Sequence, residues 1–356
     1  MKKDKLPGLG KIHPDFFNRH IYRKLGKPDP SVLVKPQNGV DFGVIAIGPR
    51  VMVVSTDPFF IASELGMRKA AWFAVHIIAS DVAVSGIAPK YLAVDLNLPP
   101  GITEGQLVEL WDTVHSECSR LGISVVTGHT ARYAGCNYPM VGGATMFGTG
   151  RRSKLIIPSA KEGDAVIVSK GPAIETTGLM AAYFPDFIES FYGPAFLKRA
   201  RRIFYQMSTV KDAAIAASVG GLTSMHDATE CGVWGGLFEI ARHSRVGMRI
   251  DLDKIIIQEE ARLVCSCFGI DPYKSISEGT LLATADRRKA RAIISALESE
   301  GIPASIAGEV TGRGDGIKVF TGGSSYELDH PRVDPFWAKF EEHLLRRNER
   351  KNTRLS

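Results

Sequence analysis

The sequence has no long hydrophobic run and few cysteines. No window of about eighteen uncharged apolar residues occurs, so no segment has the length and hydropathy of a membrane-spanning helix. The basic N-terminus is not followed by the apolar core of a signal peptide. Five cysteines in 356 residues are odd in number and too sparse for a disulfide framework. We therefore expect a cytoplasmic protein with reduced thiols and no contact with a membrane.

Zinc-site and nucleic-acid signatures are also lacking. Cys265 and Cys267 have no second Cys or His pair at zinc-site spacing, so inert thiols are the simpler interpretation. The net charge of +6 would suit an anionic partner. However, the basic runs at 198–202 and 346–351 resemble solvated faces, and no aromatic-rich recognition motif accompanies them. A nucleic acid is thus disfavoured as a partner.

The familiar phosphate-binding loops are missing despite 36 glycines. The segment Gly143 to Gly148 has Walker spacing, but Thr149 and Gly150 stand where Lys and Ser or Thr are required. No pair of glycines has the third glycine of a dinucleotide fingerprint. A nucleotide site, if there is one, must be built from other residues.

The chain is long enough for two hydrophobic cores. β-rich runs near 51–55, 91–98, 123–127 and 140–147 alternate with helical patterns, which predicts an α+β unit with a mixed or antiparallel sheet. A second alternating series begins near 165. We expect an N-terminal domain over 1–150, a C-terminal α/β domain over 151–334, and a terminal helix from 335 to about 345 followed by a frayed basic tail.

Two helices of the first domain stand out. Thr103 and Gln106 have the spacing of a capping box, which predicts that a helix begins at Thr103. Gly122 marks the end of the periodic stretch that follows. The segment Met67 to Val84 is apolar nearly all round, which predicts a helix buried between layers. This placement puts His76 and Asp81 in apolar surroundings, where a hydrogen-bonded core histidine is the simpler interpretation for His76.

Three aspartates are the first candidates for chemistry. Asp41 lies in a turn-rich segment, Asp57 ends a predicted strand before Pro58, and Asp81 lies on the buried helix. Mg²⁺ takes carboxylate and phosphate oxygens, so converging aspartates would make a magnesium–nucleotide site. Turn roles remain the alternatives for Asp41 and Asp57. Asp81 is harder to explain without a charged partner, because a buried carboxylate is costly.

A second candidate segment is Thr127 to Thr130, which follows a predicted buried strand and turns through Gly128. His129 and Thr130 are then expected at a strand end, where α/β folds commonly bind ligands. A capping turn is the alternative interpretation.

Taken together, these segments resemble the aminoimidazole-ribonucleotide-synthetase-like superfamily. The similarity rests on Asn38 to Val44, Ser55 to Pro58, Ala79 to Gly86 and Val126 to Thr130 in the first half, and on Ser169 to Glu175, Met225 to Gly232 and Ser275 to Leu281 in the second. The superfamily includes HypE hydrogenase-maturation proteins, selenophosphate synthetases and thiamine-monophosphate kinases. The second-half motifs and Leu6 to Ile12 are most similar to HypE proteins.

The resemblance implies a two-domain PurM-like fold, in which the N-domain sheet pairs with its copy in a homodimer to form a β-barrel and the C-domain is an α/β sandwich. It implies ATP and Mg²⁺ as cofactors. Carried onto this sequence, it makes Asp41, Asp57 and Asp81 the metal ligands. It also implies that Asp41, Thr56, Gly128 and Thr130 border the nucleotide, and that Lys11 and His129 serve catalysis.

Departures from the family pattern bear on the reaction. Asp41-Phe42-Gly43 replaces the usual acidic or Asp-Ala-Ala turn, and Glu230 stands where a cation is usual. HypE proteins carry their substrate group on a C-terminal cysteine, whereas this sequence ends at Ser356. We therefore expect a HypE-like paralogue that uses ATP to phosphorylate an amide or carboxamide oxygen of a small molecule. A small-molecule kinase of the thiamine-monophosphate type and a non-catalytic maturation scaffold with a protein partner are the alternatives.

Overall fold

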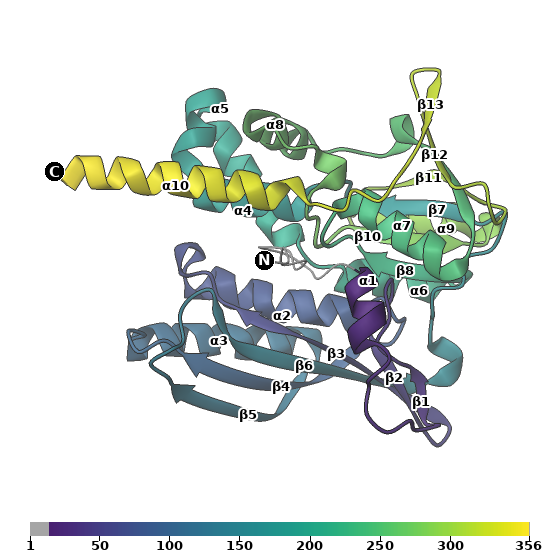
Figure 1. Ribbon diagram of the computed structural model, residues 1–356, viewed down its shortest axis with the longest axis horizontal. Helices are drawn as coiled ribbons and strands as arrows, with labels where there is room; N and C mark the ends of the chain where they lie inside the picture. The colour runs from purple at the N-terminus through teal and green to yellow at the C-terminus, as the bar shows by residue number, and fades with distance from the viewer. Residues whose placement is uncertain (1–13, 356) are drawn as a thin grey trace, which may run out of the picture.

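A computed structural model describes residues 14–355, and within this range the chain forms two mixed β-sheets with helices between and around them (Figure 1). The first sheet has the strand order β1-β2-β3-β6-β4-β5. Its strands are β1 (Val32–Val34), β2 (Gly43–Ile47), β3 (Arg50–Phe60), β4 (Pro89–Leu98), β5 (Ser124–Arg132) and β6 (Met140–Arg151). The β4–β5 pair is parallel and the other neighbours are antiparallel.

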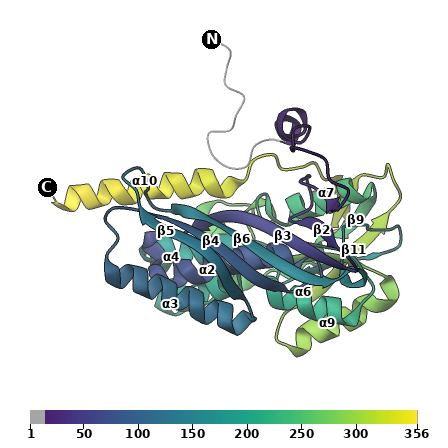
Figure 2. The same cartoon turned by 90° about the horizontal axis from the view of Figure 1, so that it is seen from below.

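Strand β3 shows how the sequence positions the site. Alternate residues of a strand face opposite sides of the sheet, and in β3 Val51, Val53, Ser55 and Phe59 are buried while Thr56 is exposed. Ser55 and Asp57 therefore share the inner face of the sheet. Thr56 lies on the outer face, which Figure 2 shows in front of the helices.

The helices of this half are α1 (Pro14–Phe16), the π-helix η1 (Phe17–Ile21), η2 (Ser63–Leu65), α2 (Met67–Ala83) and α3 (Glu104–Leu121). Helix α2 packs on the inner face of the first sheet with one side and on the C-terminal half with the other (Figure 1). It is buried nearly all round, as its sequence predicts. Helix α3 has the predicted capping box between Thr103 and Gln106, and it ends at Gly122 in the left-handed conformation.

The second sheet has the order β13-β12-β9-β11-β7-β10-β8. Its strands are β7 (Ala165–Ser169), β8 (Leu222–Asp227), β9 (Gly247–Asp251), β10 (Leu281–Ala285), β11 (Ala304–Thr311), β12 (Ile317–Thr321) and β13 (Ser324–Glu327). Strands β7 and β10 are buried at every position because the sheet has a hydrophobic core on each face. One core is continuous with that of the first domain through α2.

The helices of the second half cover both faces of this sheet. They are α4 (Ile174–Tyr183), α5 (Pro185–Ala200), α6 (Val210–Val219), α7 (Gly232–Ser244), α8 (Glu259–Phe268), α9 (Arg287–Ser299) and α10 (Pro335–Leu355), with short helices η3 (Arg152–Lys154), η4 (Ile203–Gln206), η5 (Leu252–Lys254) and η6 (Pro272–Lys274). Helix α7 packs in one core and α6 and α9 in the other. Helix α5 is bent where Gly193 leaves the helical conformation.

The terminal helix is longer than the sequence predicts. Helix α10 does not end near Leu345 in a frayed tail but continues to Leu355, lying across α4 and α5 (Figure 1). Phe340 packs against Tyr183 and Phe184 at centroid distances of 4.8 and 5.5 Å. His343 lies among Phe184, Phe187 and Phe268. These aromatic contacts anchor the first part of the helix to the second domain.

Candidate functional site

Acidic side chains from both domains meet near the C-terminal end of α2. Asp41, Asp57 and Asp81 come from the first domain, and Asp227 and Glu278 come from the second. The electrostatic influence of Asp57, Asp227 and Asp41 on Asp81 places these carboxyls in one neighbourhood. We refer to these five residues as the acidic cluster.

Ser55 holds the first-domain part of this cluster together. Its hydroxyl donates a 2.6 Å hydrogen bond to Asp81 Oδ2 and lies 3.1 Å from the carbonyl oxygen of Asp41. Ser55 and Asp81 are both buried, with 6% and 8% exposure. The buried face of β3 and the buried face of α2 thus meet through a polar contact within an otherwise apolar layer.

Burial and like charge control protonation in the cluster. Desolvation, followed by the charges of Asp57, Asp227 and Asp41, raises the pKa of Asp81 well above its usual value. Desolvation also raises the pKa of Asp41 to about 6, although the neighbouring His226 acts in the opposite direction. Carboxylates that repel one another in this way are suited to hold a cation.

His226 crosses from the second domain to the first. Its Nδ1 lies 3.0 Å from Asp41 Oδ2 and 3.6 Å from Asp227 Oδ1, while its Nε2 lies 2.7 Å from Glu239 Oε2. Burial lowers the pKa of this imidazole, but the surrounding carboxylates outweigh burial and hold the pKa well above its usual value. In the protein without a bound metal ion, the protonated His226 imidazole therefore offsets part of the negative charge of the acidic cluster.

Asp227 and Glu278 are the most deeply buried carboxyls of the cluster. Burial acts to raise the pKa of Asp227, but the neighbouring His226 outweighs burial and lowers this pKa. Both are essentially buried, with 0% and 1% exposure, and their carboxylate oxygens accept no hydrogen bond from the described part of the chain. Desolvation and then the charges of Asp227 and Glu175 raise the pKa of Glu278 well above its usual value. Buried polar atoms are nearly always satisfied in folded proteins, so these oxygens need an external partner.

The donor set fits a magnesium ion. Mg²⁺ prefers oxygen ligands and is usually held by one or two carboxylates together with water and substrate phosphates. The acidic cluster offers carboxylates from β3, α2 and β8, with partly open access at Asp41, whose side chain is 17% exposed. Asp41, Asp57 and Asp81, the residues predicted as ligands, belong to this cluster, but in the described chain their oxygens do not form a group within 4.8 Å of one another.

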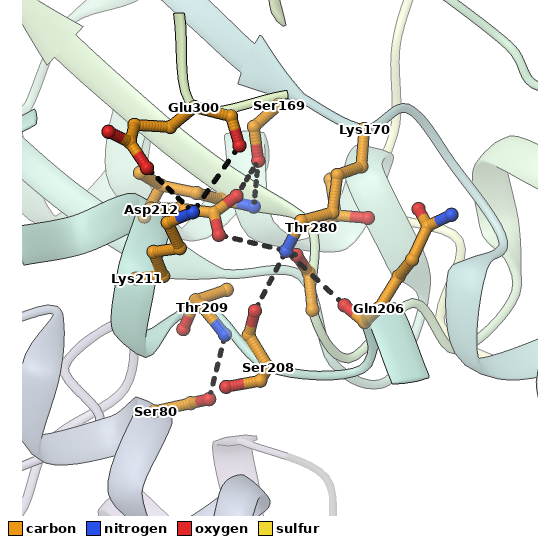
Figure 3. Close-up of polar contacts among 12 residues, drawn as sticks. Ser80, Ser169, Lys170, Gln206, Ser208, Thr209, Lys211, Asp212, Thr280 and Glu300 are labelled. Atoms are coloured by element: carbon orange, nitrogen blue, oxygen red, sulfur yellow. Dashed lines mark hydrogen bonds and ion pairs between the residues drawn. The ribbon is translucent and has the colours of Figure 1, made fainter. Parts of the chain in front are cut away.

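A buried lysine fixes the loops on which the cluster depends. Lys170 Nζ lies 2.9 Å from Asp212 Oδ2 and donates hydrogen bonds to the carbonyl oxygens of Gln206, Ser208 and Gly279 at 3.2, 2.7 and 2.7 Å (Figure 3). Gly279 directly follows Glu278. The ammonium group therefore ties the loop that carries Glu278 to the segment 206–209.

The same segment is tied to the first domain. Thr209 N donates a 3.0 Å hydrogen bond to Ser80 Oγ, next to Asp81 (Figure 3). The hydroxyl of Ser208 lies 2.8 Å from His76 Nδ1, and the other nitrogen of His76 lies 3.1 Å from Glu117. His76 is thus the hydrogen-bonded core histidine that the sequence favoured. Lys170 therefore links the loop that carries Glu278 to the segment 206–209, and this segment in turn contacts α2 of the first domain.

The other predicted site residues do not join the cluster. Thr56 lies on the outer face of the first sheet, where its hydroxyl donates to the carbonyl oxygen of Ala144 at 2.9 Å. Gly128, His129 and Thr130 are not at a strand end, because β5 continues to Arg132, and this strand is exposed along nearly its whole length. His129 contacts Tyr133 with its Nε2 3.0 Å from the hydroxyl. Lys11 lies outside the described residues.

Sequence reasoning missed the contribution of the second domain. Asp227 and Glu278 lie in segments that were recognised as similar to the family, yet neither was chosen as a site residue. Asp227 ends strand β8 beside His226, and Glu278 lies in the buried segment that precedes β10. A buried acidic residue beside a histidine at a strand end was the available signal.

A surface cavity of about 730 Å³ lies away from the acidic cluster. It is lined by α2, α3 and η4, with Trp72, Glu117 and Tyr205 among its walls. None of the cluster residues lines it. The acidic cluster at the domain interface is therefore separate from this cavity.

The two-sheet architecture and the interdomain acidic cluster define a two-domain PurM-like α+β protein. Residues 39–152 match the N-terminal domain of AIR synthase related proteins, and residues 161–320 match the C-terminal domain of the same family. The chain belongs to the AIR synthase related family. No helix in residues 14–355 combines the length and the apolar character needed to cross a membrane.

HypE proteins are prominent among the relatives. The chain is 26% identical over 295 residues to a carbamoyl dehydratase HypE of Rhizobium leguminosarum, covering 76% of this chain and 77% of the relative. The structure is similar to that of HypE in a HypE–HypF complex, with a TM-score of 0.68 and 20% identity over 81% of this chain and 93% of the other.

Solved structures with bound nucleotides share the fold as well. A HypE structure in complex with ATP has a TM-score of 0.64 and 20% identity, covering 91% of this chain and 97% of the other. A ThiL structure with AMPPCP and TMP also has a TM-score of 0.64, with 18% identity over 82% of this chain and 90% of the other. At these identities the likeness establishes the fold alone.

Proposed function

We propose that this protein binds MgATP at the acidic cluster and uses it to phosphorylate an amide or carboxamide oxygen of a small molecule. The observation that carries the proposal is the buried set of carboxylates at the domain interface, two of which have no hydrogen-bond partner in the described chain. A magnesium ion bound beside these carboxylates would offset their negative charge and bring the phosphates of ATP to the same place. The HypE relative whose structure contains ATP supports the choice of nucleotide.

The chemistry follows from charge. Phosphoryl transfer needs little covalent participation by the protein, because positioning and charge stabilisation supply most of the catalysis. Magnesium, held by Asp41, Asp57 and Asp81, would supply positive charge for the transferred phosphoryl group. Phosphorylation converts an amide oxygen from a poor leaving group into a good one, after which the bond to carbon can break. Lys11 and His129 remain our candidates for further contacts in this reaction, and Thr56, Gly128 and Thr130 for contacts with the nucleotide.

We further propose a homodimer formed through the first sheet. Strand β5 is an edge strand that pairs only with β4 within residues 14–355. Val125 and Val126 are 39% and 55% exposed there. An exposed edge strand with apolar side chains is a template for pairing with another chain. A second copy pairing at β5 would cover this edge and close the outer face of the sheet into a barrel, with Thr56 and His129 near the contact.

A small-molecule kinase of the thiamine-monophosphate type is the second candidate, and the ThiL structure with a nucleotide analogue and TMP favours it. A maturation scaffold that binds nucleotide without turnover is the third, with a protein partner as in the HypE–HypF complex. The carboxamide reaction and the kinase reaction differ in product. In the first the phosphoryl group ends as free phosphate, whereas in the second it stays on the acceptor.

The test is an assay of nucleotide turnover by the full chain with MgATP and separate panels of carboxamides and phosphorylatable alcohols. We expect ADP and free phosphate in equal amounts with a carboxamide acceptor, and loss of both with Asp57→Asn. ADP without free phosphate, together with a phosphorylated acceptor, would instead identify a kinase. Binding of MgATP with no turnover on either panel would favour the scaffold.

A further inference from the structure

The geometry points to a transition-metal site formed by Asp41, His226 and Asp227, with a ligand set different from that proposed for magnesium. We infer that this site takes a divalent first-row transition ion such as Zn²⁺ in preference to Mg²⁺. The inference goes beyond the proposed function, because it concerns a nitrogen ligand that MgATP binding does not require.

The three residues already present one ligand atom each to a common point. His226 Nδ1, one oxygen of Asp41 and one oxygen of Asp227 all lie within 4.8 Å of one another. Asp41 comes from the first domain, whereas His226 and Asp227 end strand β8 of the second. A metal ion at this point would therefore join the two domains.

The histidine is oriented as a metal ligand. Glu239 Oε2 lies 2.7 Å from Nε2, so Glu239 can accept the Nε2–H hydrogen bond of a ring whose Nδ1 binds a metal ion. Metal-binding histidines usually donate their second ring N–H to a carboxylate or carbonyl, which fixes the tautomer and the ring orientation. Nδ1 is then the nitrogen that faces Asp41 and Asp227.

Several atoms that face the site lack hydrogen-bond partners. His226 Nδ1 lies within ion-pair distance of Asp41 but makes no hydrogen bond of normal geometry within the described residues. Both carboxylate oxygens of Asp227 likewise make no hydrogen bond within the described residues. His226 and Asp227 are only 2% and 0% exposed. A metal ion would bind Nδ1 as its proton leaves and would satisfy the carboxylate oxygens.

The ligand types determine the class of ion. Imidazole suits Zn²⁺, Fe²⁺, Ni²⁺ and Cu²⁺, whereas Mg²⁺ strongly prefers oxygen. The set also matches open zinc sites in its number of protein ligands, which is three, and in the use of imidazole and carboxylate donors. Asp41 belongs both to this set and to the proposed magnesium ligands, so the two ions would lie on either side of it.

The test is metal binding by the full chain in the absence of nucleotide. The protein is stripped with EDTA, transferred to chelator-free buffer, and titrated with Zn²⁺ by calorimetry and with Co²⁺ by visible absorption, which reports coordination. We expect His226→Gln to weaken Zn²⁺ binding about 10- to 100-fold and to change the Co²⁺ spectrum. Glu239→Gln, which alters only the support of the imidazole, should weaken binding less.

The matched control is His115→Gln, since His115 is an exposed histidine on α3 and should leave both titrations unchanged. Wild-type Zn²⁺ affinity in His226→Gln, or no preference of the wild-type protein for Zn²⁺ over Mg²⁺, would overturn the inference. If His226→Gln does not fold, Glu239→Gln provides the test, and a wild-type Zn²⁺ affinity in Glu239→Gln would then overturn the inference. MgATP binding, measured on the same samples, tests the proposed function separately.

Discussion

The hydroxyl of Ser55 donates a 2.6 Å hydrogen bond to Oδ2 of Asp81, joining the buried face of β3 to the buried helix α2. This contact explains how a carboxylate is retained in a helix that is otherwise almost wholly apolar. It gives Asp81 one strong partner but leaves the repulsion from Asp57, Asp227 and Asp41 uncompensated. The arrangement favours cation binding at the expense of the stability of the metal-free protein.

Asp81→Asn should therefore stabilise the metal-free protein and weaken magnesium binding. Asparagine can still accept the Ser55 hydrogen bond, but it carries no charge to be desolvated or repelled. We expect an increase of about 1–3 kcal/mol in the free energy of unfolding and at least about a tenfold loss of Mg²⁺ affinity. Thermal unfolding in EDTA and magnesium calorimetry measure the two effects. A less stable variant that binds Mg²⁺ normally would show that Asp81 is only a structural carboxylate.

The metal-free protein should lose stability as the pH rises from about 4 to 8. The pKa of Asp41 is raised to about 6, so the folded state holds its proton more tightly than the unfolded state, and ionisation destabilises the fold. The raised pKa of His226 acts with the same sign, because its stabilising charge is lost as the pH rises through the folded pKa. Both contributions favour the fold at low pH.

Thermal unfolding across this pH range, in EDTA and in excess Mg²⁺, provides the measurement. Asp41→Asn should flatten the metal-free profile, since it removes one of the titrating groups and the partner of His226. Magnesium should raise the stability mainly at the alkaline end, where the carboxylates are ionised. A metal-free protein that gains stability between pH 6 and 8 would contradict the protonation states described here.

Lys170→Met should be strongly destabilising because it leaves the Asp212 carboxylate buried without its cation. Breaking a buried pair from one side typically costs about 3–5 kcal/mol. The double variant Lys170→Met, Asp212→Leu should recover part of this loss. Lys211→Met is the control, since Lys211 makes an exposed ion pair with Glu300 and exposed pairs contribute little to stability. Denaturant unfolding measures the stability of the three variants. Equal losses of stability in Lys170→Met and Lys211→Met would contradict a structural role for the buried Lys170 ammonium group.

Val126→Lys should dissociate the proposed dimer. Val126 is 55% exposed on the edge strand β5, so a charge there costs little in the monomer and opposes strand pairing. The control is Val108→Lys, which places the same charge at a 51% exposed position on α3. Light scattering at micromolar concentration should report a dimer for the wild type and for the control, and a monomer for Val126→Lys. A monomeric wild type would remove the barrel model.

Much of the first domain could be predicted from local signals. The capping box at Thr103 and the all-round apolar pattern of α2 are properties of short segments, and both were confirmed. The length of α10 was not predictable in the same way. Its polar second half has no apolar periodicity, and the aromatic contacts of Phe340 and His343 that anchor the helix involve residues far away in the sequence.

The site was predictable only in part. Asp41, Asp57 and Asp81 were identified because an acidic residue in an apolar or strand-end context is conspicuous. The charges of Asp57 and Asp41 do act on Asp81, but in the described chain the ligand atoms that come within 4.8 Å of one another are those of Asp41, His226 and Asp227. His129 was misplaced because nothing local showed that β5 continues to Arg132. The convergence of Asp227 and Glu278 on Asp81 depends on how two domains pack, which no single segment encodes.

Binding of MgATP by the acidic cluster is measured by calorimetric titration of the full chain with ATP. The titration is run with Mg²⁺, with EDTA, and with Asp57→Asn, and is repeated as a thermal-shift assay. We expect saturable binding that needs Mg²⁺, a rise of about 2.7 kcal/mol in stability at a ligand concentration of about 100 times Kd, and loss of both effects in the variant. Absence of binding by both methods at millimolar MgATP, or binding that is unchanged in EDTA and in Asp57→Asn, would contradict it.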